Sequence, residues 1–194
     1  MPRIVETIVT TVDAGGVPHI APLGLIEDAG GWIIAPFRPS RTLNNLTMNP
    51  FAVASHTSDV RVFAGCVTGR KNWPTVPVGD GEAVRLADAV SHWELAVDRV
   101  TEDEQRPRFH CHITHAASHA PWQGYNRAEA AVLELAVLST RLHMLLPEKI
   151  DAELKYLEIA ISKTAGPREQ EAWGWLMQRV DAFRRGDASA VGKL

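Results

Sequence analysis

Residues Phe37 to Val53 read FRPSRTLNNLTMNPFAV and place polar side chains around the expected start of a short helix that follows a strand. The polar residues at this start are Arg38, Ser40, Arg41, Thr42 and Asn45. Ser40 is a good N-cap, and the first amides of a helix, at the positive end of its dipole, favour an anion. Residues three or four positions apart share one helix face, so Thr42 and Arg41 can converge with Asn45. The stretch predicts a phosphate site. An ordinary surface helix with a capping serine and solvated arginines explains the same residues equally well.

The overall composition is that of an ordinary globular protein. The chain has 194 residues, of which 45% are hydrophobic and 22% charged, enough for one core and an appended subdomain. Its formal net charge of -3 gives no global electrostatic reason to bind nucleic acid or an anionic membrane. We therefore expect no nucleic-acid partner, and any anion site must be local.

The N-terminus MPRIVETIVTTV lacks the order of basic, apolar and small residues that marks a signal peptide. No stretch approaches the roughly 20 apolar residues of a membrane span. We expect a cytoplasmic protein without a membrane partner, in which Cys66 and Cys111 are buried, reduced thiols.

The sequence pattern changes near Gly124, from alternating β-type runs to long helical periodicity. About six or seven short-linked strands before this point favour a closed antiparallel barrel, since an open sheet leaves edges to protect. Residues 59–68 are expected to form a short helix and residues 72–82 a loop. The expected strands are Arg3 to Val12, His19 to Glu27, Trp32 to Pro36, Phe51 to His56, Ala83 to Leu86, Ser91 to Val100 and Arg108 to His115.

The C-terminal third carries three apolar stripes at helical spacing, in residues 128–145, 150–161 and 173–183. Pro147 and the Gly166-Pro167 pair separate them. Such stripes indicate packing, here on the barrel or on a second subunit. The predicted organisation is a barrel of residues 1–123, a helical subdomain of residues 124–186 and a frayed tail of residues 187–194.

Several segments in this order resemble the flavin-reductase-like FMN-binding split-barrel superfamily. Within it, the chain is similar to an uncharacterised family, that of domain of unknown function 447, found mainly in archaea and methylotrophic bacteria. The resemblance implies a homodimeric split barrel with FMN at the subunit interface and a C-terminal helical subdomain. The segments that carry it are VETIVTT (Val5 to Thr11), APLG (Ala21 to Gly24), RPSRTLNNL (Arg38 to Leu46), HTSDV (His56 to Val60) and GYNRAEAAVLELAVLSTRLHML (Gly124 to Leu145).

The resemblance also implies roles for individual residues. Arg41 and Thr42, with Ser40 and Asn45 in support, correspond to partners of the FMN phosphate. The walls of the isoalloxazine site correspond to the strand with Ala21, Leu23 and Gly24 and to the segment Ser55, His56 and Thr57. The chain departs from the family pattern at Ser55-His56, where an asparagine is expected. Without the asparagine side chain, we expect contacts to the flavin edge at this point to come from the backbone.

The chemistry of FMN agrees with this assignment, because a dianionic phosphate needs charge-assisted donors and the ring needs an apolar slot. The sequence contains no GxSxG elbow, Walker loop or GxGxxG fingerprint. We expect an FMN-dependent oxidoreductase that acts on an unknown small molecule. The alternative is a non-catalytic module that binds a flavin, a deazaflavin or haem.

A second enzyme hypothesis starts from RFHCHITHAASH, in which His110, His112, His115 and His119 lie within ten residues. Two histidines at alternate positions of a strand share one face, and such a pair with a third ligand can hold zinc or iron. Asp59, Asp80 or Glu82 could supply a remote ligand. The favoured interpretation is a strand with histidines on its exposed face and with Cys111 and Ile113 pointing inward.

Asn126 and Arg127 open the first long helix, where they could reach the flavin of a partner subunit. Asn126 is also a plausible N-cap, with Glu129 three residues later as in a capping box. The capping role is slightly favoured.

Overall fold

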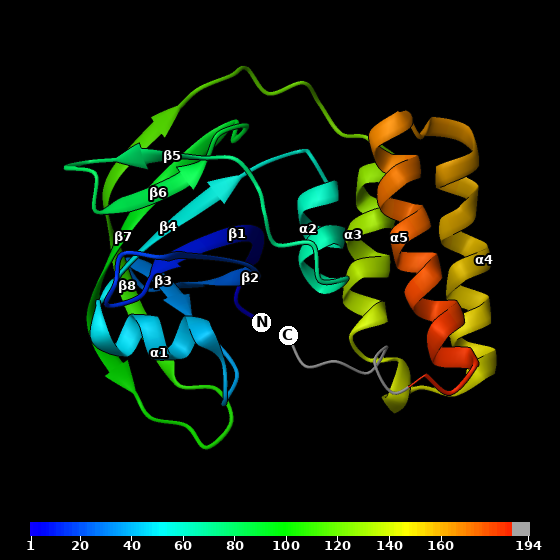
Figure 1. Cartoon of the computed structure of the whole chain (residues 1–194), viewed down its shortest axis with the longest axis horizontal. Coiled ribbons are helices and arrows are strands. Elements are labelled where there is room, and N and C mark those ends of the chain that lie inside the picture. The colour runs from blue at the N-terminus through cyan, green and yellow to red at the C-terminus, as the bar shows by residue number, and fades with distance from the viewer. Residues whose placement is uncertain (188–194) are drawn as a thin grey trace. The chain divides into compact units, whose positions relative to one another are not determined.

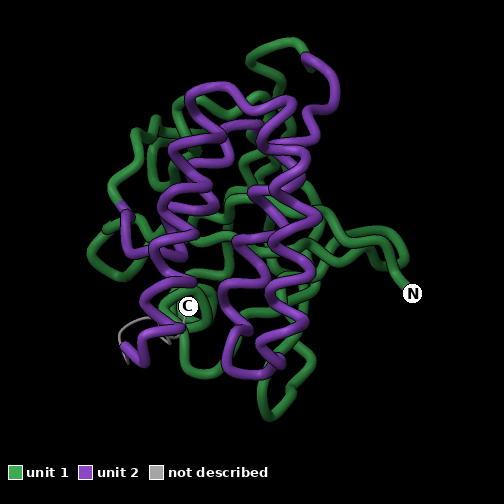
Figure 2. Tube along the Cα trace, turned by 90° about the vertical axis from the view of Figure 1, so that its right-hand side faces the viewer, with its two compact units in different colours: residues 1–57, 72–122 green, residues 58–71, 123–194 purple. Residues whose placement is uncertain are grey.

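The computed structural model describes residues 1–187, which divide into two compact units (Figure 2). The first unit comprises Met1–Thr57 and Asn72–Trp122, and the second comprises Ser58–Lys71 and the chain from Gln123 onward. Residues 58–71, inside the expected barrel segment 1–123, thus belong to the second unit. The expected frayed tail lies, from residue 188 on, outside the described residues.

The first unit is a closed six-stranded antiparallel barrel in the order β1-β2-β3-β8-β7-β4 (Figure 1). Short turns join the first three strands, and Gly16 and Gly30 adopt φ angles of 76° and 91°, which favour glycine. The predicted barrel is therefore confirmed. Its strands are β1 (Ile4–Val12), β2 (Pro18–Asp28), β3 (Gly31–Ile34), β4 (Phe51–His56), β7 (Ser91–Thr101) and β8 (Arg108–Ser118).

Alternate residues of the strands fill the barrel, with α1 (Arg41–Met48) packed against it. Leu43 and Leu46, on one face of α1, join the same apolar cluster as Val9, Leu25 and Leu95. The alternation predicted for these strands thus places their apolar face inside the barrel, and α1 is held through its apolar side.

The first unit also contains a separate two-stranded sheet, formed by β5 (Thr75–Val78) and β6 (Ala83–Leu86). The expectation of a loop at β5 was wrong, because Pro77 pairs with Val84 in an edge strand, where a missing N–H is tolerated. The N–H of Leu86 donates to Ser55 Oγ at 3.1 Å, which ties β6 to β4.

The second unit is helical: α2 (Arg61–Val67), α3 (Arg127–Ser139), a 3₁₀ turn (Leu142–Met144), α4 (Pro147–Thr164) and α5 (Pro167–Arg184). Its core is formed by the apolar stripes of these helices, including Leu135, Leu154 and Leu176. The first long helix ends at Ser139, before the end that the sequence predicted at Pro147. The hydroxyls of Ser139 and Thr140 donate to carbonyls one turn earlier, and such bonds compete with helix continuation.

Among the described helices, none has the length and apolar content that a membrane crossing requires.

Candidate functional site

The N-terminus of α1 is built to receive an anion. Ser40 Oγ accepts a hydrogen bond of 3.2 Å from the N–H of Leu43, which confirms the predicted N-cap. The N–H groups of Arg41 and Thr42 precede the helical hydrogen-bond ladder and are left for water or a ligand. No acidic residue lies in the first turn of α1. The positive end of this helix therefore carries no negative side chain from its own first turn.

Arg41 extends this positive end, with half of its side chain exposed. Its Nη2 lies 3.1 Å from Asp13 Oδ2, in the turn between β1 and β2. Hydrogen bonds from the N–H of Val17, from Arg41 and from the N–H of Gly15 lower the pKa of Asp13. The carboxylate is thus ionised at neutral pH, and it fixes the position of Arg41.

Arg38 is directed elsewhere. Its Nη2 lies 2.6 Å from Glu102 Oε2, and its Nε donates to the carbonyl of Asp103 at 3.2 Å. Arg106 lies in the same β7–β8 connection, donates through Nε and Nη2 to the carbonyl of Ala35, and stacks over the ring of Phe37. Arg106 was not among the predicted site residues, since nothing in the polar run TEDEQRPR distinguishes it from a solvated arginine.

Thr42 and Asn45 are each only 3% exposed. The side-chain amide of Asn45 donates to Thr11 Oγ1 of β1 at 3.0 Å, in a buried position. The predicted phosphate residues therefore do not all meet at one point. Ser40 and Arg41 lie at the open end of α1, whereas Asn45 joins the helix to the barrel.

The residues predicted to form the isoalloxazine walls divide between the two faces of the barrel wall. Leu23 packs with the interior cluster, and Ala21 shares its face by alternation. Gly24 lies on the other face, where a Cβ would come within 2.6 Å of Ile4 Cγ2. Gly24 itself has no side chain, and the side chains of Ile4 and Glu6 in β1 occupy the space beside it.

Ser55 and His56 are the last two residues of β4, and Thr57 follows the strand. Ser55 is fully buried and accepts the hydrogen bond from β6 described above, and Thr57 is half-buried. The His56 ring points to the barrel interior, where its edge meets Trp93 at a centroid distance of 4.4 Å; Trp93 lies 5.0 Å from Trp32. The sequence does not reveal this aromatic group, because its members come from three strands.

His56 is held in a largely apolar environment. Its Nδ1 lies 3.1 Å from Ser91 Oγ, while its buried Nε2 has no hydrogen-bond partner among the described residues. Burial lowers the pKa of His56, so the ring is neutral at physiological pH.

His110 and His112 do not share a ligand. His110 Nδ1 lies 3.0 Å from Asp28 Oδ2, whereas His112 Nδ1 lies 2.7 Å from Asp98 Oδ1. Cys111 is buried as expected, and burial raises its thiol pKa to about 12. Ile113 shares the inner face of the barrel wall with Leu95, with which it pairs, but unlike Leu95 it is 39% exposed. β3 pairs with β8 only as far as Cys111, and within residues 1–187 no other strand pairs with this edge of β8 beyond that point.

Asn126 is the N-cap of α3, as the favoured interpretation stated. Its Oδ1 accepts from the N–H of Ala128 at 2.8 Å, and its Nδ2 donates to the carbonyl of Thr164 at 3.3 Å. Both ends of the amide are thus used within the helical unit, and Arg127 is exposed.

Two protein-family models match consecutive parts of the chain. Residues 5–120 match the N-terminal domain of a family described as protein of unknown function (DUF447), and residues 126–178 match the second domain of that family. The chain belongs to the DUF447 family. No protein of the curated set matches it in sequence.

Solved structures show the same fold. An FMN-bound DUF447 protein from Methanosarcina mazei matches with a TM-score of 0.77 and 20% identity, over 92% of this chain and 95% of its own. Flavoredoxin from Methanosarcina acetivorans matches with a TM-score of 0.50 and 16% identity, over 61% and 69%. A homologue of nitrilotriacetate monooxygenase component B from Mycobacterium thermoresistibile matches with a TM-score of 0.52 and 12% identity, over 61% and 70%. The fold of this DUF447 chain is therefore the flavin-reductase-like split barrel.

Proposed function

We propose that this DUF447 protein binds FMN and acts as a flavin-dependent oxidoreductase on a small molecule. The observation that carries the proposal is the open N-terminus of α1, with Ser40 as its cap and Arg41 beside it. An FMN-bound structure from the same family and the split-barrel fold support FMN as the cofactor, and nothing observed favours deazaflavin or haem.

The phosphate end of FMN fits the residues present. A dianion at the start of α1 would receive the N–H groups of Arg41 and Thr42 and the guanidinium of Arg41, which has N–H donors besides the Nη2 that meets Asp13. We assign Asn45 and Thr42 to the support of this helix, since both are buried.

The ring of FMN needs an apolar wall with a few backbone donors and acceptors. The backbone of β2 around Gly24 and the chain at Thr57, directly after β4, are the segments that we propose for this wall. When bound, the isoalloxazine supplies hydride and electron transfer, and the protein positions it and controls access. His56 is neutral and buried near this end of β4, so it contributes no charge beside the ring.

We further propose that two copies of the chain form a homodimer with FMN at their interface, as the split-barrel resemblance implies. Light scattering of the full chain, with and without FMN, measures this directly. A monomer that still binds FMN stoichiometrically would reject the interface location while leaving the cofactor assignment intact.

The experiment that tests the cofactor compares FMN with riboflavin, which lacks the phosphate, by fluorescence titration of the full chain after removal of bound flavin. We expect Arg41→Ala to weaken FMN binding by roughly 5- to 150-fold, equivalent to about 1–3 kcal/mol for a lost charge-assisted contact. Riboflavin affinity should stay unchanged, because riboflavin makes no phosphate contact.

Two further variants sharpen the comparison. Arg38→Ala should change FMN affinity little, because Arg38 is occupied by Glu102, and Lys155→Ala on the exposed face of α4 reports nonspecific charge effects. Equal losses in Arg41→Ala and Lys155→Ala, or no FMN binding by the wild type, would refute the phosphate assignment.

Turnover separates an oxidoreductase from a flavin-binding module. The FMN-loaded protein is mixed anaerobically with NADH or NADPH, and the visible flavin absorbance is followed before and after an electron acceptor is added. Bleaching and repeated recovery at a catalytic rate support the enzyme. The flavin-binding module is favoured if a chemical reductant bleaches the bound flavin but neither nicotinamide nor a panel of small-molecule donors reduces it.

A further inference from the structure

A compact group of metal-ligating side chains lies on β7 and β8, away from α1. His92 and Glu94 are two residues apart on β7, so they share a face, and they are only 3% and 9% exposed. The intervening Trp93 and the following Leu95 pack with the barrel interior. His92 and Glu94 therefore lie on the outer face of the barrel wall, although both are buried.

The third member of the group is brought in by a β-bulge. Leu95 pairs with Ile113 and Glu94 pairs with His115, so Thr114 is an extra residue in β8. A bulge shifts the alternation of the strand that contains it. The shift places His115 directly across from Glu94 and on the same face as His92. One ligand atom from each of His92, Glu94 and His115 lies within 4.8 Å of the others.

The orientation of His92 is fixed at both ring nitrogens. Its Nε2 lies 3.4 Å from Glu94 Oε1, and its Nδ1 lies 2.9 Å from His119 Nε2, with the two imidazole rings stacked. His115, by contrast, is exposed, and its ring centroid lies 5.9 Å from that of His92. One histidine and one carboxylate are thus preset, and a second imidazole is available beside them.

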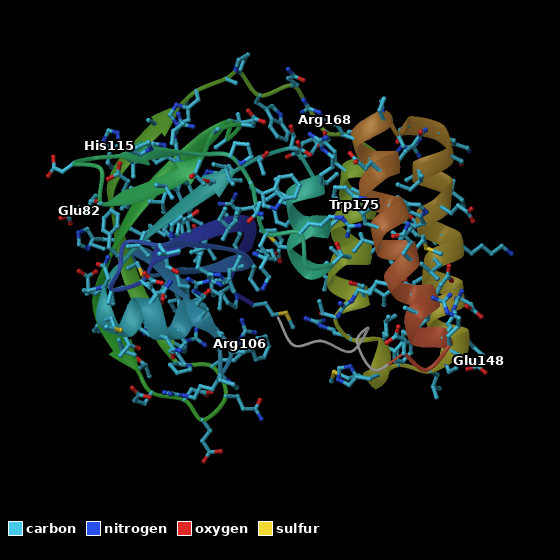
Figure 3. All side chains as sticks on the ribbon, in the orientation of Figure 1. Glu82, Arg106, His115, Glu148, Arg168 and Trp175 are labelled. Atoms are coloured by element: carbon cyan, nitrogen blue, oxygen red, sulfur yellow. The ribbon has the colours of Figure 1, made fainter. Side chains whose placement is uncertain are left out.

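The hairpin of β5 and β6 closes one side of this group. A Cβ built on Gly79, in the hairpin turn, would lie 3.6 Å from Glu94 Oε2. Figure 3 shows His115 of β8 and Glu82 of the β5–β6 turn on the same side of the barrel unit. The hairpin explains why Glu94 is buried on a face that otherwise points outward, and the exposed position of His115 leaves access from solvent.

We propose that His92, Glu94 and His115 form a Zn²⁺ site, with His92 Nε2, a Glu94 carboxylate oxygen and one His115 ring nitrogen as ligands. His119 is a positioning residue, since its Nε2 accepts the Nδ1–H of a zinc-bound His92. The two imidazoles and one carboxylate leave the fourth tetrahedral position to water, as in zinc sites that keep an open position.

The distances agree with this ligand set. Zinc bonds of about 2.0–2.2 Å in a tetrahedron place neighbouring ligand atoms about 3.4 Å apart. The His92–Glu94 pair already has this separation of 3.4 Å. The ligand atoms of the whole group lie within 4.8 Å of one another, and rotation of the exposed His115 side chain would bring its ring nitrogen to the tetrahedral spacing. His110 and His112, which the sequence singled out, hold separate carboxylates and do not belong to this site.

The test uses the full chain without a histidine tag, stripped with a chelator and titrated with Zn²⁺ against a chromophoric competitor. We expect one tight site per chain and, with Co²⁺ as a probe, the intense visible bands of a tetrahedral ion. His115→Ala should weaken Zn²⁺ binding by at least about 100-fold, because loss of a ligand costs more than the 10- to 100-fold typical of an outer partner.

His112→Ala is the matched control, since His112 is an exposed histidine of the same strand with its own carboxylate. This variant should keep wild-type affinity, and His119→Gln should lie between the two without changing the Co²⁺ band pattern. The proposal is overturned if the wild type takes up no Zn²⁺, if His115→Ala binds as tightly as wild type, or if His112→Ala loses as much affinity. None of these outcomes depends on FMN, so they test the metal site separately from the flavin assignment.

Discussion

The side-chain amide of Asn45 in α1 donates a buried hydrogen bond of 3.0 Å to Thr11 Oγ1 in β1. This bond joins the helix that carries the proposed phosphate site to the barrel wall. Asn45 thus acts on the site through the position of α1, and we expect its loss to affect folding stability more than phosphate recognition.

Asn45→Ala should lower the free energy of unfolding by about 1–3 kcal/mol, because Thr11 Oγ1 is left buried without this donor. Urea denaturation of the apo-protein measures the change, and the double variant with Thr11→Val should recover part of it. The ratio of FMN to riboflavin affinity should stay at the wild-type value. A ratio that falls as far as in Arg41→Ala would show that Asn45 contacts the phosphate.

The barrel itself follows from local patterns in the sequence. Alternating apolar residues and glycine turns mark β1 to β3, and Ser40 caps α1 because a serine before a helical run satisfies an early N–H. These features depend on residues close in sequence, so they were predictable.

The parts that sequence did not reveal depend on contacts between distant strands. The Thr114 bulge decides that His115, and not His110 or His112, meets Glu94, and no local pattern marks a bulge. The helical periodicity of α1 likewise places Asn45 near Arg41, but it does not show that the amide turns inward to Thr11.

Asp13 places a negative charge beside the arginine that we assign to the phosphate. Asp13→Asn should tighten FMN binding, because it removes electrostatic repulsion between the carboxylate and the dianion, and it should leave riboflavin binding unchanged. The gain should shrink as the salt concentration rises. Asp98→Asn, which removes a charge at His112 instead, serves as the control. Weaker FMN binding in Asp13→Asn would show that positioning of Arg41 by Asp13 outweighs the repulsion.

His56 should make the apo-protein sensitive to mild acid. Burial lowers its folded pKa below the unfolded value of about 6.5, so the unfolded state binds more protons as the pH falls through this range. The free energy of unfolding should therefore fall from pH 6.5 downward, until the folded ring is protonated as well. Denaturant titrations at pH 8 and pH 5 measure the loss.

His56→Gln retains a polar group for Ser91 and removes the titrating ring, so it should lose less stability between these pH values than wild type. His143→Gln, at an exposed position of the helical unit, should behave as wild type. Identical pH dependence in all three proteins would mean that His56 is protonated equally in the folded and unfolded states.

Asp59 and Arg61 form an ion pair at the start of α2. Arg61 donates to Asp59 through Nε at 2.9 Å and Nη2 at 2.6 Å, and Asp59 is only 5% exposed. Burial alone would raise the pKa of Asp59, but the hydrogen bonds and charge of Arg61 outweigh it and lower that pKa. Asp59→Asn should therefore cost about 1–3 kcal/mol of unfolding free energy at pH 7.

The cost of Asp59→Asn should depend on pH in a defined direction. A carboxylate with a depressed folded pKa stabilises the protein above its unfolded value of about 3.9, and the stabilisation is lost as the pH falls through the folded pKa. The difference between wild type and Asp59→Asn should then shrink between pH 5 and pH 3, as measured by denaturant titration at each pH. A difference in unfolding free energy that stays constant with pH would show that the carboxylate charge contributes nothing. The cost of Asp59→Asn would then come from the poorer hydrogen-bond geometry between the amide and Arg61.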